Sequence, residues 1–279
     1  MESRKIGIIA GMGELPCIIA KEAKKEGYRI FTIALKELAS SEIEDYSDEV
    51  KWLSIGKLGG IIESLKAAGI KEALMAGKAP KELLYRSRII PDLRAIKLLM
   101  GLKDRKDDTI MLAIVNEIQK EGIKILKTTD FATSLVVGEG VLTRKKPSKA
   151  QMEDIEFGFR IAKEIGRLDI GQTVVVKDKA VMAVEAIEGT DRAIKRGGKF
   201  AGEGAVVVKV SKPQQDLRFD VPVAGLDTIR SMKESGCAVL GLESGGCLLL
   251  QREKVIEEAD SSGIVIVGYS GVPKKSADS

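Results

Sequence analysis

The 279-residue chain contains no histidine. Histidine is the most frequent general base in enzymes and the most common side-chain ligand of metals, so its absence removes a large class of mechanisms. Acid–base or metal chemistry in this protein must therefore use carboxylates, lysines, tyrosines or thiols.

Thiols are also few. The three cysteines, Cys17, Cys237 and Cys247, are odd in number and have no C-x-x-C spacing. This pattern argues against a disulfide framework and against a thiolate metal site, and it favours a reducing compartment. Cys17 follows a glycine turn, where a helix N-terminus can activate a thiol. We favour the alternative, a small buried hydrophobic side chain.

Long apolar runs are missing, and aromatic residues make up 4% of the chain. The first apolar run, residues 6–10, is too short for a signal peptide or a membrane span. We therefore expect a soluble, cytoplasmic protein. The net charge of +4 suits an anionic substrate or a peripheral contact with an acidic membrane surface. Without a basic block that carries interleaved aromatics, nucleic-acid binding is not expected.

The composition, 44% hydrophobic and 31% charged, is typical of a globular protein. In residues 1–130, short apolar runs alternate with segments of helical spacing. Strands are expected at 6–10, 29–34, 50–53, 73–76 and 123–127, and helices at 16–26, 58–68, 92–102 and 107–121. This α/β alternation predicts a Rossmann-like domain with a parallel, doubly wound sheet.

Residues 131–147 contain glycines, charges and Pro147 without regular periodicity, which predicts a linker. Residues 148–279 are expected to form a mixed α/β catalytic domain. It should contain a hairpin at 172–186 around Lys177-Asp178-Lys179, because a tight turn joins two apolar runs there. The other expected elements are helices at 149–165, 226–235 and 253–259, strands at 205–209 and 264–268, and paired strands at 238–242 and 247–251.

Two glycine loops follow strands of the first domain. Gly11-Met12-Gly13 comes after residues 6–10, and Gly77-Lys78 comes after residues 73–76. Ligands of open α/β sheets bind at this edge, so the loops predict contacts to a phosphate or nucleotide. Tight turns without a ligand explain the same residues. A dinucleotide-dependent oxidoreductase is disfavoured because Pro16 occupies the place of the third glycine.

Charged residues gather in two segments of the second domain. The first segment holds Glu185, Thr190 and Asp191, near a strand end and a helix start. The second segment, the twelve residues 209–220, holds Lys209, Lys212, Asp216, Arg218 and Asp220. Carboxylates this close repel one another unless a cation lies between them, and Mg²⁺ or Mn²⁺ prefers oxygen ligands. We favour a phosphate- and metal-binding site over a surface network of salt bridges. Asp107-Asp108 permits a similar choice, between metal ligands and the acidic first turn of a helix.

Several motifs in order resemble a known family. LDIGQTVVV (168–176), MAVEAIEGTDRAIKR (182–196) and KPQQDLRFDVPVAGLDTI (212–229) are similar to the UDP-2,3-diacylglucosamine pyrophosphatases of lipid A biosynthesis that are unrelated to calcineurin-like phosphoesterases. GMGELP (11–16), AGKAP (76–80), DDTIMLAIVNEIQKEG (107–122) and GVLTRKKPS (140–148) agree with this resemblance. It covers nearly the whole chain.

The resemblance implies an enzyme that holds its lipid-linked UDP-sugar between two domains and hydrolyses the pyrophosphate with a divalent metal. The resemblance further implies that water attacks the phosphorus on the sugar side, which would yield UMP and 2,3-diacylglucosamine 1-phosphate (lipid X). The family's essential aspartate corresponds to Asp220.

From local chemistry we add further expected roles. Glu185 and Asp191 would support Asp220 as ligands of Mg²⁺ or Mn²⁺, and Lys209, Lys212 and Arg218 would neutralise phosphoryl charge. Gly11, Gly13, Gly77, Lys78 and Thr190 are expected to bind substrate. The alternative is a nucleotide- or lipid-binding regulatory protein without turnover. The sequence also leaves a homo-oligomer open.

Residues 83–102, LLYRSRIIPDLRAIKLLMGL, alternate apolar residues with cations. Such a pattern suits a peripheral contact with the inner membrane, where acyl chains and anionic head groups meet. A buried helix pair with its charges turned to water explains the same pattern, and we favour this alternative slightly.

Overall fold

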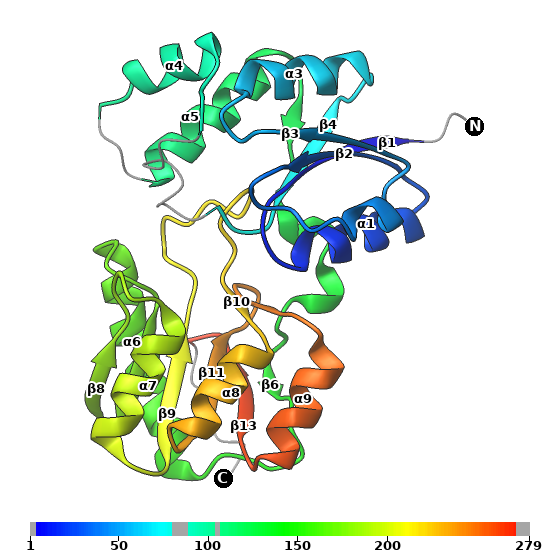
Figure 1. The fold of residues 1–279 in the computed structure, drawn as a ribbon. Coiled ribbons are helices and arrows are strands. Elements are labelled where there is room, and N and C mark those ends of the chain that lie inside the picture. Colours follow the sequence, from blue (N-terminus) through cyan, green and yellow to red (C-terminus); the bar gives the residue numbers. More distant parts are fainter. Residues whose placement is uncertain (1–3, 80–88, 104–106, 272–279) are drawn as a thin grey trace. The chain divides into compact units, whose positions relative to one another are not determined.

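The computed structural model describes residues 4–79, 89–103 and 107–271, with Asp107 and Asp108 described by their backbone alone. The chain forms two compact units (Figure 1). Unit 1 contains Met1–Ala132 together with Leu217–Phe219, and unit 2 contains Thr133–Asp216 and Asp220–Ser279. A three-residue segment from the second half of the sequence therefore belongs to the first unit.

Unit 1 contains a five-stranded parallel sheet in the order β3-β2-β1-β4-β5. Its strands are β1 (Lys5–Ala10), β2 (Arg29–Leu35), β3 (Glu49–Leu53), β4 (Glu72–Ala76) and β5 (Lys124–Ile125). The strand order reverses direction between β1 and β4, which is the switch point of a doubly wound fold. The predicted Rossmann-like sheet is confirmed.

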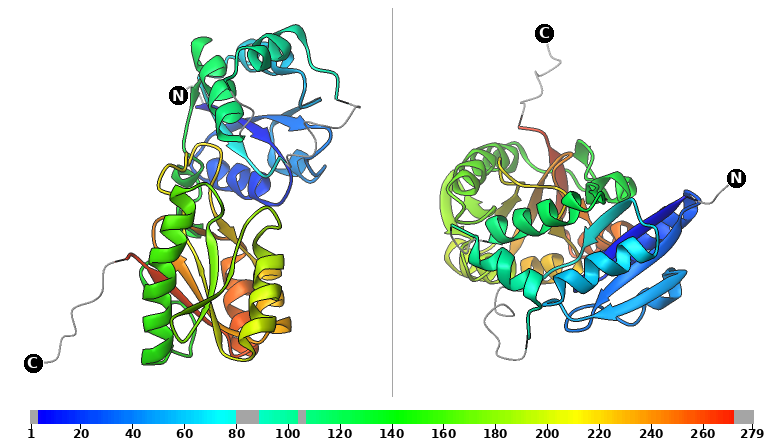
Figure 2. Two further views of the ribbon diagram at one scale, coloured as in Figure 1. Left: turned by 90° about the vertical axis from the view of Figure 1, so that its left-hand side faces the viewer. Right: turned by 90° about the horizontal axis from the view of Figure 1, so that it is seen from above.

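Helices cover both faces of this sheet, with α1 (Leu15–Lys25) on one face and α3 (Leu58–Ala67) and α5 (Asp107–Lys120) on the other (Figure 2). The short α2 (Ile43–Tyr46) follows β2. The apolar sides of α3 and α5 meet β1 and β2 in one core cluster, which includes Ile33, Ile62, Leu65 and Ile118.

Helix α4 (Leu93–Met100) packs on its helical neighbours. The Asp92 carboxylate accepts hydrogen bonds from the N–H groups of Ala95 and Gly59, at 2.9 and 2.7 Å, and so caps α4 while it contacts the start of α3. Arg94 pairs with Glu117 and Glu121 at 2.9 and 2.6 Å. Polar contacts therefore fix α4, although its apolar residues are largely exposed.

Unit 2 contains a six-stranded mixed sheet in the order β6-β13-β11-β9-β7-β8. Strands β9 (Ala205–Lys209), β11 (Cys237–Glu243) and β13 (Val265–Tyr269) are parallel, while β6 (Gly140–Val141), β7 (Thr173–Lys177) and β8 (Ala180–Val184) pair antiparallel at the two edges. The predicted hairpin is confirmed. Its turn residues Asp178 and Lys179 have φ of 51° and 57°, and both their N–H groups donate to the Asp154 carboxylate.

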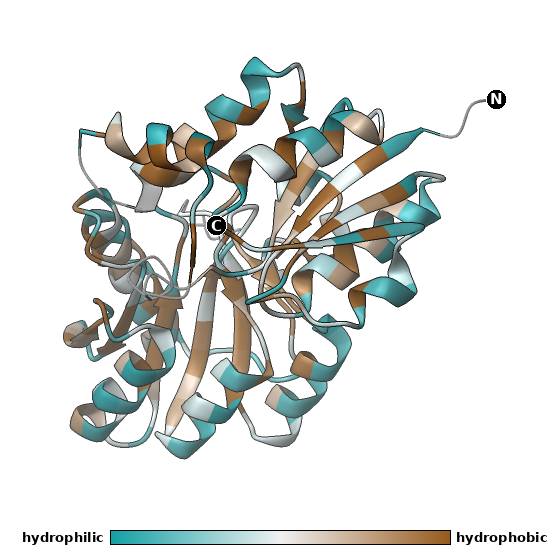
Figure 3. Ribbon diagram, turned by 45° about the horizontal axis from the view of Figure 1, so that its top comes forward, coloured by the Kyte–Doolittle hydropathy of each residue, from teal (hydrophilic) through white to brown (hydrophobic). Residues whose placement is uncertain are grey.

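The second sheet is also covered on both faces. Helix α6 (Lys149–Arg167) lies on one face, and α7 (Thr190–Ala201), α8 (Leu226–Glu234) and α9 (Arg252–Ser261) lie on the other (Figure 1). Helix α6 begins with a capping box between Ser148 and Gln151. Figure 3 shows apolar residues concentrated in the strands and polar residues on the outer sides of the helices. No helix within the described ranges has the length and apolar character that a membrane crossing requires.

The expected pairing of residues 238–242 with 247–251 is wrong. Strand β11 already has β9 and β13 on its two sides, and the Cys247 N–H closes a tight turn onto the Glu243 carbonyl at 3.1 Å. This turn carries the chain away from the sheet. Strand β12 (Leu248–Leu249) pairs instead with β10 (Val223–Ala224) in a separate two-stranded sheet.

Within residues 131–147, which we predicted as a linker, the chain forms the 3₁₀ turn η3 (Thr133–Leu135) and strand β6. The preceding 3₁₀ turn, η2 (Thr128–Asp130), belongs to unit 1.

Candidate functional site

The two glycine loops of unit 1 lie against each other. Gly11 N–H donates to Ala76 O at 2.7 Å, and Met12 and Lys78 exchange backbone hydrogen bonds of 2.9 Å. Gly77 has a φ of 95°, and a Cβ there would lie 2.7 Å from Met12 O. The glycines at 11 and 77 therefore allow a close approach of two backbones. Because Gly11, Met12 and Lys78 use their N–H groups within the loops, these groups do not point to a ligand.

Three predicted residues of unit 2 form a hydrogen-bonded line. The Lys209 ammonium donates to Thr190 Oγ1 at 3.0 Å, and the Thr190 hydroxyl donates to Glu185 Oε1 at 2.8 Å. The strand registers place Lys209 opposite Thr173 and Val184 opposite Val174. The ends of β8 and β9 therefore meet at one edge, which is the carboxyl edge of the parallel strands and the usual ligand edge of such sheets.

Lys209 is buried, with 6% of its surface exposed. In the described part of the chain its side chain donates to the Thr190 hydroxyl, and no carboxylate pairs with it directly. A buried ammonium without a charged partner is costly, and an anionic ligand would offset that cost. Thr190 begins α7, whose N-terminal end adds positive potential at the same place. This edge of unit 2 suits a phosphate group.

Asp220 lies in a compact loop that follows β9. Its N–H donates to Asp216 O at 3.0 Å, and its Oδ2 accepts a hydrogen bond from Gln215 Nε2 at 2.6 Å. No described residue donates to Oδ1. The carboxylate is therefore held at one oxygen and open at the other.

The other predicted charges have separate environments. Lys212 pairs with Asp169 at 2.6 Å, and Arg218 donates to Gln119 Oε1 of α5 at 3.0 Å. Arg218 belongs to unit 1 by its contacts, whereas Asp220 belongs to unit 2. Asp191 is exposed in the first turn of α7.

The three predicted carboxylate ligands are not assembled. Among the described residues, no three His, Cys, Asp or Glu side chains gather closely enough to hold a metal ion. Glu185 accepts from Thr190, and Asp220 accepts from Gln215. The side chains of Asp107 and Asp108 lie outside the described part of the chain.

A second polar cluster at this edge was not predicted. Lys163 of α6 contacts both carboxylate oxygens of Glu243, at 2.6 and 2.7 Å, and donates to Ser211 O at 2.8 Å. Glu243 Oε2 in turn accepts from the N–H and the hydroxyl of Ser211, each at 2.7 Å. The cluster fixes the start of the loop that leads to Asp220. These residues are far apart in the sequence, so no local pattern could have indicated them.

The thiols make one backbone contact at this site: the Cys247 thiol donates to Lys209 O at 3.5 Å. All three cysteines are buried and free. Burial raises the pKa of Cys247 to about 12 and that of Cys237 to about 11. Burial also raises the pKa of Cys17, with contributions from nearby acidic residues that include Glu42. The favoured reading of Cys17 as a buried hydrophobic residue is confirmed.

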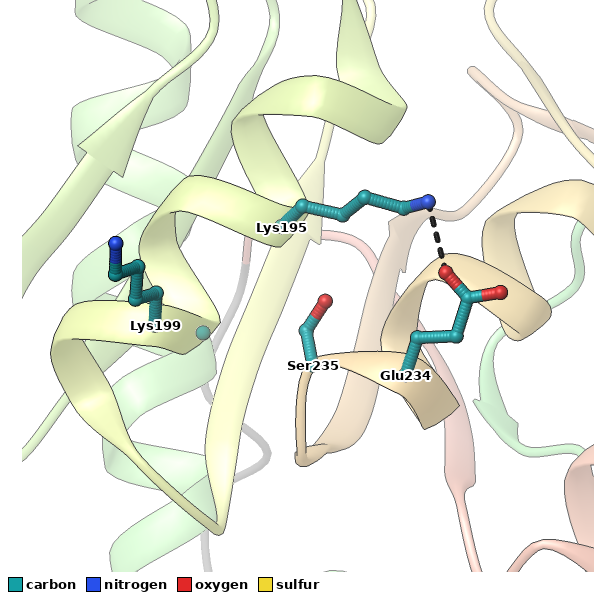
Figure 4. A pocket seen from close by; sticks show the side chains of 5 residues that line it. Lys195, Lys199, Glu234 and Ser235 are labelled. Atoms are coloured by element: carbon teal, nitrogen blue, oxygen red, sulfur yellow. Dashed lines mark ion pairs between the residues drawn. The ribbon is translucent and has the colours of Figure 1, made fainter.

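A shallow pocket lies between the ends of α7 and α8, lined by Lys195, Gly198, Lys199, Glu234 and Ser235 (Figure 4). Lys195 and Glu234 pair there at 2.7 Å. This pocket is near the last turn of α7, whereas Thr190 marks the first. It therefore lies away from the Lys209 line and contains none of the predicted residues.

Comparison with solved structures gives weak likenesses. The biotin carboxylase domain of the Hydrogenobacter thermophilus 2-oxoglutarate carboxylase is 15% identical, with a TM-score of 0.27, over 64% of this chain and 36% of that chain. Phosphoribosylglycinamide synthetase from Anaerococcus prevotii is 13% identical, with a TM-score of 0.26, over 68% of this chain and 34% of that chain. These scores are too low to carry an argument.

Comparison with protein families is decisive. The LpxI N-terminal domain matches residues 5–135, and the LpxI C-terminal domain matches residues 138–267. A Caulobacter vibrioides protein named UDP-2,3-diacylglucosamine pyrophosphatase LpxI is 33% identical over 276 residues, which cover 95% of this chain and 97% of that protein. The resemblance inferred from the motifs is confirmed, and the chain belongs to the LpxI family.

Proposed function

We propose that this protein hydrolyses the pyrophosphate of UDP-2,3-diacylglucosamine to UMP and 2,3-diacylglucosamine 1-phosphate in lipid A biosynthesis. Membership of the LpxI family along the chain and the name of the Caulobacter relative support the activity. The observation that supports a phosphate site is the buried Lys209, which lacks a direct carboxylate partner among the described residues.

The residues of the Lys209 line have distinct tasks in this proposal. Lys209 binds a phosphate oxygen and stabilises the charge that develops there, because a preorganised cation acts strongly in a water-poor site. Thr190 orients the ammonium through its hydroxyl, and Glu185 fixes the hydroxyl. Lys212 and Arg218 add positive charge around the pyrophosphate.

A divalent metal fits the available donors. Asp220 offers an open oxygen, and Mg²⁺ is often held by one or two carboxylates together with substrate phosphates. A set of three protein carboxylates is therefore not required, and we propose Asp220 as the metal-binding residue. When bound, Mg²⁺ or Mn²⁺ supplies positive charge beside the phosphate oxygens and lowers the pKa of water.

In the reaction, a water oxygen forms a bond to the phosphorus on the sugar side. The bond from that phosphorus to the bridging oxygen breaks, and UMP leaves with the bridging oxygen. Asp220 Oδ1, the oxygen that Gln215 does not occupy, would hold either the metal or the attacking water, and the proton lost by the water leaves to solvent. Binding of the substrate between the two domains stays a prediction.

The test is turnover of UDP-2,3-diacylglucosamine by the purified protein with Mg²⁺. EDTA should stop release of UMP, and Mg²⁺ or Mn²⁺ should restore it. Asp220→Ala should remove at least ~3 kcal/mol of transition-state stabilisation, roughly 10² in kcat, while substrate binding survives.

The matched control is Asp227→Ala. Asp227 is exposed on α8 and pairs with Arg230, so its loss should leave kcat unchanged. Tight substrate binding without turnover in the wild-type protein would favour the regulatory alternative. Full activity after chelation would remove the metal from the proposal.

We further propose that α4 contacts the membrane that supplies the lipid substrate. Ile90, Leu93 and Met100 have 71%, 77% and 81% of their surface exposed, and Ile96 is also exposed. The exposed Lys97 lies beside them, which suits an anionic membrane surface. Of the segment first considered, residues 83–88 lie outside the described part of the chain.

The two adjacent isoleucines, which the sequence could not distinguish, have different environments in the structure. Ile89 packs against the core of unit 1, whereas Ile90 is exposed. Ile89→Ser should therefore lower the melting temperature by several degrees. Ile90→Ser should leave the melting temperature unchanged and weaken binding to phosphatidylglycerol vesicles, with phosphatidylcholine vesicles as the control. Unchanged vesicle binding by Ile90→Ser combined with Leu93→Ser would contradict the membrane contact.

A further inference from the structure

We infer that Gln215 is a positioning residue for Asp220. Its side chain holds one oxygen of the Asp220 carboxylate so that the other oxygen faces the substrate. The inference rests on the role proposed for Asp220. It starts from the hydrogen bond of 2.6 Å between Gln215 Nε2 and Asp220 Oδ2.

The orientation of the Gln215 amide is determined by its other end. Gln215 Oε1 accepts a hydrogen bond of 2.8 Å from the backbone N–H of Lys212. A backbone N–H can only donate, so the amide oxygen must face Lys212 and the amide nitrogen must face Asp220. The side chain thus presents a donor to a carboxylate, which accepts.

Both partners are attached to a fixed backbone. Gln215 N–H donates to Lys212 O at 2.9 Å, which closes a turn, and Pro213 restricts φ at the second position of that turn. Asp220 N–H donates to Asp216 O at 3.0 Å. The neighbouring Gln214 donates to Gly166 O at 2.8 Å, and so attaches the same turn to the end of α6.

A neutral donor has a specific advantage at this position. A lysine would neutralise the Asp220 charge that the proposed chemistry uses, and a glutamate would repel it. An amide restricts rotation of the carboxylate and leaves its charge in place. Such supporting hydrogen bonds hold catalytic carboxylates in their productive orientation.

Three variants separate this role from a structural one. Gln215→Glu keeps the acceptor for the Lys212 N–H and removes the donor to Asp220, whereas Gln215→Leu removes both. Asp227→Ala is the control, because Asp227 is exposed on α8, pairs with Arg230 and lies outside this turn. The measurements are kcat, KM, the melting temperature, and the dissociation constant of the substrate in metal-free buffer.

For Gln215→Glu and Gln215→Leu we expect kcat to fall at least about tenfold, as is typical when the partner of a catalytic ligand is lost. The dissociation constant of the substrate should stay within about twofold, since Gln215 does not touch substrate in this proposal. Gln215→Glu keeps the turn closed but places a second carboxylate beside Asp220, so its melting temperature should fall, and kcat is therefore compared per folded molecule. In the Asp220→Ala background, Gln215→Leu should cause no further loss of rate.

The outcomes distinguish this inference from the proposed function. If Asp220→Ala is inactive but Gln215→Glu and Gln215→Leu keep the wild-type kcat, the role of Gln215 is refuted and the proposed function stands. If Asp220→Ala keeps the wild-type kcat, the role of Asp220 itself fails. A lower melting temperature for both Gln215 variants, with kcat per folded molecule intact, would show that Gln215 is purely structural.

Discussion

Two lysines of unit 2, Lys163 and Lys209, differ in how their side-chain charge is compensated. Lys163 contacts both oxygens of Glu243 and the carbonyl of Ser211, so its charge is compensated. Lys209 is more deeply buried, yet its described side-chain partner is the hydroxyl of Thr190. In the proposed function, Lys163 stabilises the fold, whereas Lys209 binds an anionic phosphate group.

Substitution by methionine should distinguish the two lysines. Lys209→Met removes a buried charge that lacks a direct partner, so the free energy of unfolding should be unchanged or higher, while turnover falls roughly 10²-fold. Lys163→Met leaves Glu243 without its cation and should lower the free energy of unfolding by about 2 kcal/mol, a figure reduced from buried pairs because the pair is partly exposed. Urea unfolding and UMP release measure the two effects.

A different result from these two methionine variants would contradict the role proposed for Lys209. If Lys209→Met destabilises the protein as much as Lys163→Met and the folded fraction keeps its turnover, Lys209 has a structural role. Lys209→Arg, which keeps the charge but not the geometry, provides a second test of whether the position needs an ammonium.

At the residue level, the sequence could predict neighbours along the chain but not partners across it. Glu185, Thr190 and Lys209 were selected because they lie in two segments rich in charge, the first near a strand end and a helix start, and the structure brings them together. The role of Asp220 came from the resemblance. Gln215 was missed because a glutamine carries no charge signal, and Lys163 was missed because its partners lie 48 and 80 residues away.

At the level of elements, periodicity was a reliable guide. Both sheets and the hairpin follow from apolar runs, glycine stops and the turn at Asp178 and Lys179. The pairing of β12 was mispredicted because adjacency along the chain does not determine which strand edge is still free. The exposure of α4 was also ambiguous, since its apolar stripe suits either a core or a membrane.

Ion pairs join three helices of unit 1. Glu121, the residue that follows α5, accepts from Lys66 at 2.5 Å and from Arg94 at 2.6 Å, which links the C-terminal end of α5 to α3 and α4. The hydrogen bond from Lys66, followed by that from Arg94, lowers the pKa of Glu121 to about 2. Because the folded-state pKa lies below the unfolded one, the carboxylate stabilises the fold above about pH 4.5 and loses this effect as the pH falls toward 2.

Glu121→Gln should therefore be less stable than the wild type at pH 7, and the difference should shrink as the pH falls below about 4.5. Urea unfolding across this range measures it. Glu63→Gln, on the exposed side of α3 and outside the described ion pairs, is the control and should show no such difference. A gap between Glu121→Gln and wild type that stays constant down to pH 3 would contradict the pKa argument.

At the scale of the whole molecule, the two units are not simply successive halves of the chain. Residues Leu217–Phe219 leave unit 2 and join unit 1 before Asp220 returns to unit 2. Thr128 N–H donates to Leu217 O at 3.1 Å, and Phe219 packs against the core of unit 1. The sequence predicted a single domain boundary near residue 131, where the composition changes. Composition could not indicate that the short segment Leu217–Phe219 contacts the first unit.

This arrangement predicts that a residue from the second half of the sequence stabilises the first unit. Phe219→Ala should lower the free energy of unfolding of unit 1 by about 1–3 kcal/mol, less than for a fully buried phenylalanine because Phe219 is partly exposed. Hydrogen exchange should show reduced protection in α5 and β4, while β9 and β11 stay protected. Phe200→Ala, a change at a side chain of α7 that is 69% exposed, is the matched control and should alter neither unit. Equal loss of protection in both units would mean that Phe219 supports the molecule as a whole, whereas unchanged protection in α5 would show that unit 1 folds without it.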